Sequence, residues 1–122
     1  MKSEKITISE AELEIMKVLW KQGVPVNTQS INKEVGHKGW KRTTISTLLA
    51  RLVEKGAVSG EKEGNTYYYL PLISAGEYRR AQTKNFIRNL YGGSAKELAV
   101  SLFEDNRLSD EDIRDLKKMF QL

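Results

Sequence analysis

Small hydroxyl side chains and cations are concentrated between residues 41 and 55, a segment whose apolar residues recur every three or four positions. That spacing predicts an amphipathic helix. Its buried stripe is predicted to contain Ile45, Leu48, Leu49, Leu52 and Val53. The opposite side presents Thr43, Thr44, Thr47, Ala50 and Arg51. Because threonine is a poor helix former, three threonines on an exposed face favour a binding role over plain contact with water.

The residue types on this face are those that contact double-stranded DNA. The major groove admits one α-helix and displays a distinct set of donors, acceptors and methyl groups at each base pair. Short hydroxyl side chains can contact base edges there, whereas cations contact phosphates and hold the helix in register. We expect Thr43, Thr44 and Thr47 to contact base edges or thymine methyl groups, and Ala50 to let the backbone come close. Ser46 is expected to belong to the same DNA-binding surface. We expect phosphate contacts from Lys41, Arg42 and Arg51.

The distribution of charge supports the same interpretation. The whole chain carries a formal net charge of +4, and residues 38–62 contain six lysines or arginines against two acids. This segment alone therefore carries +4, while the signs balance elsewhere. Concentrated positive charge is what a polyanion such as DNA requires.

A β-hairpin is predicted directly after this helix, because strand-forming residues fill 57–59 and 66–70 and a Gly-Asn pair lies between them. Lys62 and Asn65 in the turn region are expected to touch the DNA backbone beside the helix. The tyrosines at 67–69 are expected to pack on the strands rather than to stack on bases.

Two further helices are predicted before the amphipathic one. Ser9 and Glu12 have the spacing of a capping box, which predicts a helix over 9–22. A second, short and polar helix is predicted after a cap at Asn27 or Thr28. Three helices followed by a hairpin form the winged variant of the helix-turn-helix.

Three more helices are predicted toward the C-terminus, over 74–90, after Ser94 and after Ser109, each with an apolar stripe. A segment of ~50 residues is too small to bury three stripes by itself, so we expect a homodimer that reads palindromic operators. The residues expected in the dimer interface are Phe86, Leu90, Leu98, Leu102, Phe103, Ile113, Leu116, Met119 and Phe120. The predicted fold is mainly α with a small β-wing, comprising a winged helix-turn-helix domain at 1–72 and a helical dimerisation domain at 73–122.

The chain contains few of the side chains that commonly act as catalytic nucleophiles, bases or metal ligands. Its 122 residues contain no cysteine and one histidine, His37, which has no second ligand at metal-binding spacing. We therefore expect no enzyme, no cofactor and no metal site, and we expect Trp20 and Trp40 to anchor the core. No apolar run reaches the ~18 residues of a membrane span, and residues 1–5 lead into no apolar signal segment. A cytoplasmic protein without membrane insertion is expected.

Several segments together follow a known pattern. They are 9–16 with Leu19-Trp20, Trp40 with 44–56, the tyrosines at 67–69, and 84–93. These segments resemble the penicillinase-repressor family, BlaI/MecI. The resemblance implies a dimeric winged-helix repressor of β-lactamase or penicillin-binding-protein genes. It also implies a membrane-bound sensor with a metalloprotease domain, after whose signal the repressor is cut in its dimerisation region.

The chain departs from the family pattern at several positions. The usual Ser-Pro-Lys start of the recognition helix is Lys41-Arg42-Thr43 here, and Ser46 stands where arginine is common. The bond that is cut in the family, typically Asn-Phe, corresponds to Ser101-Leu102. A copper-responsive branch carries a C-terminal cysteine cluster, which this chain lacks, so copper sensing is not expected.

Two other functions stay open on the sequence alone. The threonine face could be the contact surface of a winged-helix protein-interaction module. The chain could also be a small-molecule-responsive regulator of other genes, with a ligand pocket between its two parts. A strong dependence of affinity on salt concentration would distinguish DNA binding from these two alternatives, because DNA binding releases counterions.

Overall fold

Helix α2 (Glu10–Gln22) begins at a side-chain cap, as predicted. The Ser9 hydroxyl accepts a hydrogen bond from the Glu12 amide at 3.1 Å, and the Glu12 carboxylate accepts one from the Ser9 amide at 2.8 Å. This reciprocal pair satisfies backbone donors that the helix itself leaves open. The computed structural model describes residues 5–122, so the start of the chain, for which no signal segment was expected, lies almost wholly outside the described residues.

The second helix, α3 (Thr28–Glu34), is short and polar, as predicted. Asn27 is its cap, with a side chain that accepts from the Ser30 amide at 2.8 Å. A 3-10 turn, η1 (Gly36–Lys38), then leads toward the amphipathic helix and carries His37 exposed to solvent.

Helix α4 (Arg42–Glu54) is the predicted amphipathic helix. Four of the five residues predicted for its apolar stripe are buried, namely Ile45, Leu48, Leu49 and Leu52. The prediction was wrong for Val53, whose side chain is 40% exposed. Val53 lies at the edge of the stripe and borders the sheet at Gly60 instead of entering the core.

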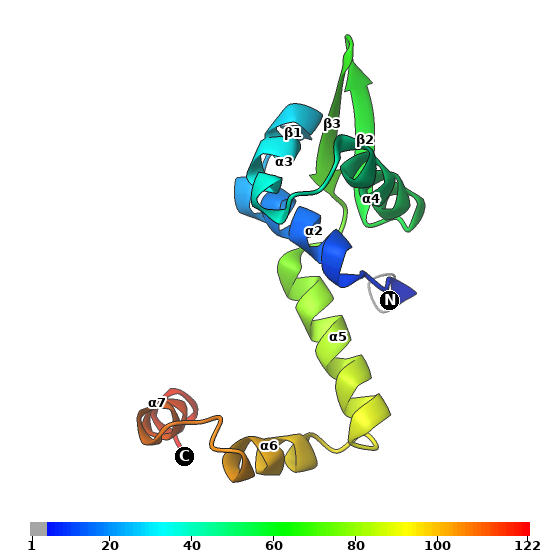
Figure 1. The fold of residues 1–122 in the computed structure, drawn as a ribbon. Helices are drawn as coiled ribbons and strands as arrows, with labels where there is room; N and C mark the ends of the chain where they lie inside the picture. The colour runs from blue at the N-terminus through cyan, green and yellow to red at the C-terminus, as the bar shows by residue number, and fades with distance from the viewer. Residues whose placement is uncertain (1–4) are drawn as a thin grey trace. The chain divides into compact units, whose positions relative to one another are not determined.

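Three antiparallel strands form a small sheet in the order β1–β3–β2 (Figure 1). The predicted hairpin consists of β2 (Val58–Glu63) and β3 (Thr66–Pro71), with Gly64 at φ 65° in the turn. Its strands are longer than predicted, because residues 60–63 pair in register with 66–69. Strand β1 (Val26–Asn27) was not predicted, since two residues are too few to show an alternating pattern.

The core lies where α2, α3 and α4 meet the sheet. Its fully buried apolar residues are Ile15, Met16, Leu19, Ile31, Val35, Leu49, Leu52 and Val58. Trp20 and Trp40 pack against this core while remaining partly exposed, which confirms their predicted role as anchors. The Trp20 indole also donates to the Ile73 carbonyl at 2.9 Å, and its ring lies 6.1 Å from that of Tyr78.

Helix α5 (Ala75–Leu90) belongs to both compact units of the chain, which are Met1–Ala81 and Gln82–Leu122. Its first turns join the N-terminal unit because Tyr78 contacts Trp20 and its hydroxyl accepts from the Ile8 amide at 3.3 Å. The compact units thus divide inside a helix, beyond the domain boundary at 72 that the sequence suggested. The functional division at 72 stays a prediction.

Two capped helices complete the C-terminal unit. Helix α6 (Ala95–Glu104) starts at Ser94, whose side chain accepts from the Glu97 amide, and α7 (Asp110–Phe120) starts with a capping box at Ser109. Both caps were predicted. Neither α6 nor α7 contains a buried residue, although both carry apolar side chains.

Candidate nucleic-acid interface

The outward side of α4 displays every residue that was predicted to contact DNA from this helix. The exposed residues are Lys41, Arg42, Thr43, Thr44, Ser46, Thr47, Ala50 and Arg51. The buried stripe of α4 holds the helix against the core, so these side chains lie on a rigid element and face solvent. The surface therefore combines four hydroxyl groups, the methyl groups of three threonines and one alanine, and three cations.

The hydroxyl of Thr47 is engaged within the helix. Its Oγ1 atom donates to the Thr43 carbonyl at 2.9 Å, one turn earlier. Hydrogen bonds of this kind are common for threonine in helices, because the hydroxyl reaches the carbonyl four residues before it. The side chain therefore presents its methyl group and an oxygen acceptor to solvent.

The N-terminus of α4 attracts anions. Lys41 occupies the cap position, and in the described part of the chain no side chain caps this helix. The amides of the first turn can therefore donate outward, and the helix dipole adds partial positive charge at the same end. Lys41 and Arg42 add full charges beside these amides. A phosphate fits this end of the helix.

Helix α3 contributes residues that the sequence interpretation missed. A hollow between α3 and the start of α4 is lined by Gln29, Asn32, Lys33, Trp40, Arg42 and Ile45. In a helix-turn-helix, the helix before the recognition helix crosses the DNA backbone, so we expect phosphate contacts from Lys33 and Gln29. The polar character of α3 was the available signal.

An ion pair between the buried Glu12 and the partly exposed Lys55 fixes the far end of α4. Lys55 Nζ donates to Glu12 Oε1 at 2.5 Å and to the Thr7 carbonyl at 2.7 Å. Glu12 is 1% exposed. Burial raises the pKa of Glu12, but hydrogen bonds from Lys55 and Ser9 and the Lys55 charge outweigh it, so the pKa lies below its usual value. The pair joins the start of α2 to the end of α4. The two residues are 43 positions apart in the chain, so no local sequence pattern predicts their contact.

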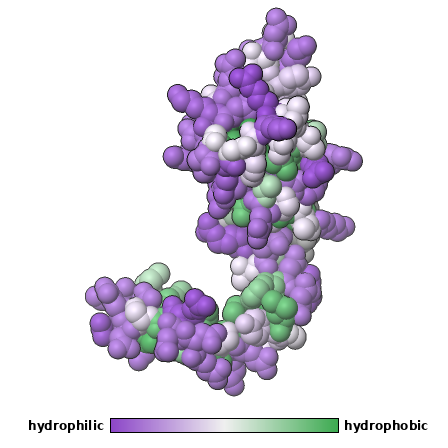
Figure 2. All heavy atoms as spheres, in the orientation of Figure 1, coloured by the Kyte–Doolittle hydropathy of each residue, from purple (hydrophilic) through white to green (hydrophobic). Residues whose placement is uncertain are grey.

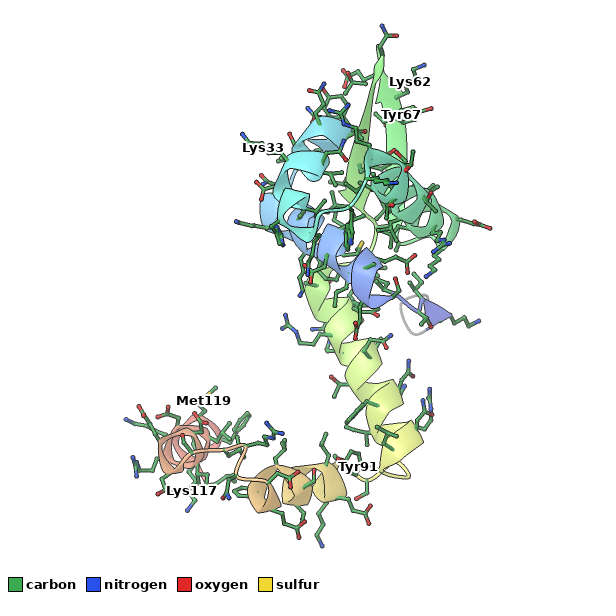
Figure 3. The ribbon with its side chains drawn as sticks, viewed as in Figure 1. Lys33, Lys62, Tyr67, Tyr91, Lys117 and Met119 are labelled. Carbon is green, nitrogen blue, oxygen red and sulfur yellow. The ribbon has the colours of Figure 1, made fainter. Side chains whose placement is uncertain are left out.

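The hairpin has two chemically different faces. Lys62 is paired with Tyr67 and Gly60 with Tyr69, so these four residues share the face on which Gly60 approaches Val53 of α4. Glu61 and Glu63 alternate with them and lie on the other face. Lys62 is thus on the α4 side of the hairpin, beside Tyr67 (Figure 3). Asn65 is exposed at the tip.

Two tyrosines on the same face of β3 differ in their exposure. Tyr69 packs against the core, whereas Tyr67 is 47% exposed, and their ring centroids lie 6.3 Å apart in a stacked arrangement. The exposed Tyr67 ring therefore extends an aromatic surface along the hairpin toward Lys62.

Comparison with known proteins identifies the family. A family model described as penicillinase repressor matches residues 8–121. This chain belongs to the penicillinase repressor family. The penicillinase repressor of Bacillus licheniformis is 36% identical over 115 residues, which cover 93% of this chain and 89% of that one. The methicillin resistance regulatory protein MecI of Staphylococcus aureus (strain N315) is 29% identical over 119 residues, which cover 98% and 97%.

Solved structures of the same family confirm the winged helix-turn-helix fold. The solution structure of the DNA-binding domain of the repressor BlaI has a TM-score of 0.54 and 44% identity. The Bacillus licheniformis BlaI monomer in complex with the blaP half-operator has a TM-score of 0.51 and 44% identity. Each match covers 59% of this chain and 88% of the solved one.

The C-terminal unit of this penicillinase repressor family member leaves large apolar side chains exposed. Among the predicted dimer residues, Phe86, Leu90, Phe103, Leu116, Met119 and Phe120 are exposed, and Leu98, Leu102 and Ile113 are partly buried. Hydrophobic side chains are correspondingly visible on the surface of this unit (Figure 2). Met119 is 71% exposed and Phe120 64%. Exposed apolar surface on this scale marks an interaction site.

The predicted cleavage pair, Ser101 and Leu102, lies inside α6. Both side chains are partly buried. The Ser101 hydroxyl donates to the Leu98 carbonyl at 2.8 Å and lies 3.1 Å from the Tyr91 hydroxyl. The Tyr91 ring also packs against Phe86, with centroids 5.8 Å apart. The bond is thus part of a helix that side-chain contacts tie to the end of α5.

Residues 5–122 contain neither a metal site nor a membrane-spanning helix. No cluster of three histidine, aspartate or glutamate side chains within residues 5–122 could hold a metal ion. Over the same residues, no helix is long and apolar enough to cross a membrane.

Proposed function

We propose that this protein is a transcriptional repressor that binds operator DNA through α4. The observation that carries the proposal is the outward side of α4, where hydroxyl groups and cations surround an uncapped helix N-terminus. A helix of this kind presents base-contacting groups along its length and a phosphate site at its start. The likeness to the BlaI domain bound to a half-operator supports it. The protein acts by binding, in the cytoplasm, without catalysis or a cofactor.

The interface residues divide into two roles. Thr43, Thr44, Ser46 and Thr47 contact base edges, where sequence is read. Lys41, Arg42 and Arg51 contact phosphates on either side of the groove, and Lys62 and Asn65 contact the backbone from the hairpin. This division agrees with the exposure of all nine residues and with the position of Lys62 on the α4 side of the hairpin.

The active form is a homodimer on a palindromic operator. The dimer buries the exposed apolar residues of α5, α6 and α7, which are too numerous to remain in water. Two DNA-binding units then read two half-sites that are about one helical turn, ~10 bp, or a multiple of it, apart. Linking the two units raises the affinity beyond that of a single half-site.

Induction follows from proteolysis in the dimerisation unit, after a signal from a membrane-bound sensor protease. We place the cut at Ser101-Leu102, in α6. Loss of the residues beyond it would remove Leu102, Phe103 and all of α7 from the dimer interface. The genes repressed would be those of β-lactamases or penicillin-binding proteins, as for the relatives of this chain that are named penicillinase repressors and methicillin resistance regulators.

Selection of duplexes from a random pool, followed by binding titrations at two salt concentrations, tests the proposal. Four cations in each protomer (Lys41, Arg42, Arg51 and Lys62) would displace counterions at about eight phosphates of a full operator. The affinity should then fall by about 10³- to 10⁵-fold between roughly 50 and 200 mM salt. A failure to enrich any sequence, or an affinity that salt leaves unchanged, would contradict the proposal.

A further inference from the structure

At Thr47, on the outward side of α4, the hydroxyl hydrogen is already engaged within the helix. It is donated to the Thr43 carbonyl at 2.9 Å. Donation to a base would require this bond to break while the carbonyl of Thr43 loses its side-chain partner. What Thr47 presents outward without any rearrangement is its γ-methyl group and an oxygen acceptor, but no hydrogen-bond donor.

Ala50 extends this apolar character. It lies three residues after Thr47, which places the two side chains next to each other on the surface of the helix, and it is exposed. Its side chain is a single methyl group. Thr47 and Ala50 together therefore form a small methyl surface, which we call the methyl pair, surrounded by groups that donate hydrogen bonds.

Of the four bases, only thymine presents a methyl group in the major groove. Guanine offers acceptors there, and these would require a donor that the methyl pair lacks. We infer that the methyl pair of Thr47 and Ala50 reads thymine by packing against its 5-methyl group. This inference rests on the proposed function, and it specifies the base type that the centre of α4 recognises.

Uracil substitution in the operator tests the inference without altering the protein. Uracil keeps every hydrogen-bonding group of thymine and lacks only the methyl group. Each thymine of a selected half-site is replaced in turn, and the affinity ratio of the thymine duplex to the uracil duplex is measured. We expect a ratio of about four at one or two positions, the effect of burying one methyl-sized group. Thymines outside the half-sites should give a ratio of one.

Two variants of Thr47 test whether its methyl group causes the difference in affinity between the thymine and uracil duplexes. Thr47→Ser keeps the hydroxyl and removes the methyl, so the ratio at the affected position should fall well below four, with only Ala50 left to pack against the thymine methyl. Thr47→Val keeps the methyl and replaces the hydroxyl, so the ratio should remain about four. Thr83→Ser makes the same change on an exposed threonine of α5 and is the matched control. Because only ratios are compared, a change in overall affinity or stability does not affect the conclusion.

The outcomes separate the inference from the proposed function. If the wild-type protein selects an operator but every thymine gives a ratio of one, the inference is overturned and the repressor proposal stands. A ratio that survives in Thr47→Ser and disappears in Thr47→Val would also overturn it, since the hydroxyl would then do the reading. If no operator is selected at all, the proposed function itself fails.

Discussion

At the scale of single residues, the outward side of α4 separates contacts that carry sequence information from contacts that do not. Threonine and serine side chains fill its centre, while Lys41, Arg42 and Arg51 stand at its borders. This arrangement suits a helix in the major groove, whose edges are lined by phosphates and whose floor displays the bases. Substitutions at the border and at the centre should therefore have different signatures.

Replacing Arg51 with alanine should weaken binding to operator and random DNA by the same factor. The lost contact is to a phosphate, which is identical in every sequence. On a half-site duplex, the slope of log affinity against log salt should decrease by about one. Lys21→Ala, an exposed lysine of α2 away from the interface, is the control. A selective loss on the operator would show that Arg51 reads a base instead.

The Glu12–Lys55 pair is the other residue-scale feature with a measurable consequence. Lys55→Met leaves the Glu12 carboxylate buried without its cation and should lower the free energy of unfolding at pH 7 by about 1–3 kcal/mol. The effect is modest because Lys55 is partly exposed and water screens the pair. Chemical denaturation measures the effect, and Lys21→Met should change stability by less than about 0.5 kcal/mol.

The pH dependence of stability gives an independent check on this pair. The pKa of Glu12 is lower in the folded protein than its usual 4.5, so its ionised form favours folding. This contribution is complete above pH 4.5 and is lost as the pH falls through the folded-state pKa. The loss in acid should be smaller in Lys55→Met than in the wild type. Equal acid profiles for the two proteins would exclude the ion pair as the cause.

At the scale of elements, local chemistry was sufficient to predict most of the N-terminal unit. The capping box at Ser9, the apolar period of α4 and the Gly-Asn turn of the hairpin are signals contained within a few residues. Features that depend on partners distant in sequence were missed. Strand β1 exists because β3 pairs with it, and Lys55 meets Glu12 across 43 residues.

The same limit applies to the candidate site. Exposure of the predicted residues on α4 followed from the helical period alone. The contribution of α3, with Lys33 and Gln29 beside the start of α4, required the packing of two helices. The division of the hairpin into a face with Lys62 and a face with Glu61 and Glu63 required the strand register. Neither the helix packing nor the register can be read from residue spacing.

The packing of the hairpin against α4 can be tested at Gly60. A Cβ atom at this position would lie 2.9 Å from a ring carbon of Tyr69 and 3.5 Å from Val53, so Gly60→Ala should displace the Tyr69 ring. We expect a destabilisation of about 1–3 kcal/mol, measured by thermal or chemical denaturation. Gly36→Ala is a matched control, because no atom lies within 4 Å of the added carbon. Equal stability of the two variants would contradict the packing.

At the scale of the whole molecule, the chain joins one well-packed unit to one whose apolar side chains face solvent. The core of the N-terminal unit is closed around residues such as Ile15 and Leu52. Helices α6 and α7 have no buried residue of their own. A second copy of the chain would supply the missing cover, so folding of the C-terminal unit and affinity for the operator should depend on protein concentration together.

A charge introduced on the apolar side of α7 should separate the protomers. Met119→Lys places an ammonium group in the expected interface, where it would be desolvated without a partner. Sedimentation should detect monomers, and affinity for a full operator should fall toward that for a half-site. Lys118→Glu also alters charge on α7 but lies on its polar side, so it should leave the dimer intact. An unchanged sedimentation coefficient for Met119→Lys would contradict the dimer interface.

Nuclear magnetic resonance of the protein during titration with a selected half-site duplex tests the central claim most directly. Amide signals of residues 41–51 and of Lys62 and Asn65 should shift, while those of buried residues in α2 should move little. Shifts confined to the Glu61 and Glu63 face of the hairpin, or to α7, would contradict the assignment of α4 as the DNA-reading helix.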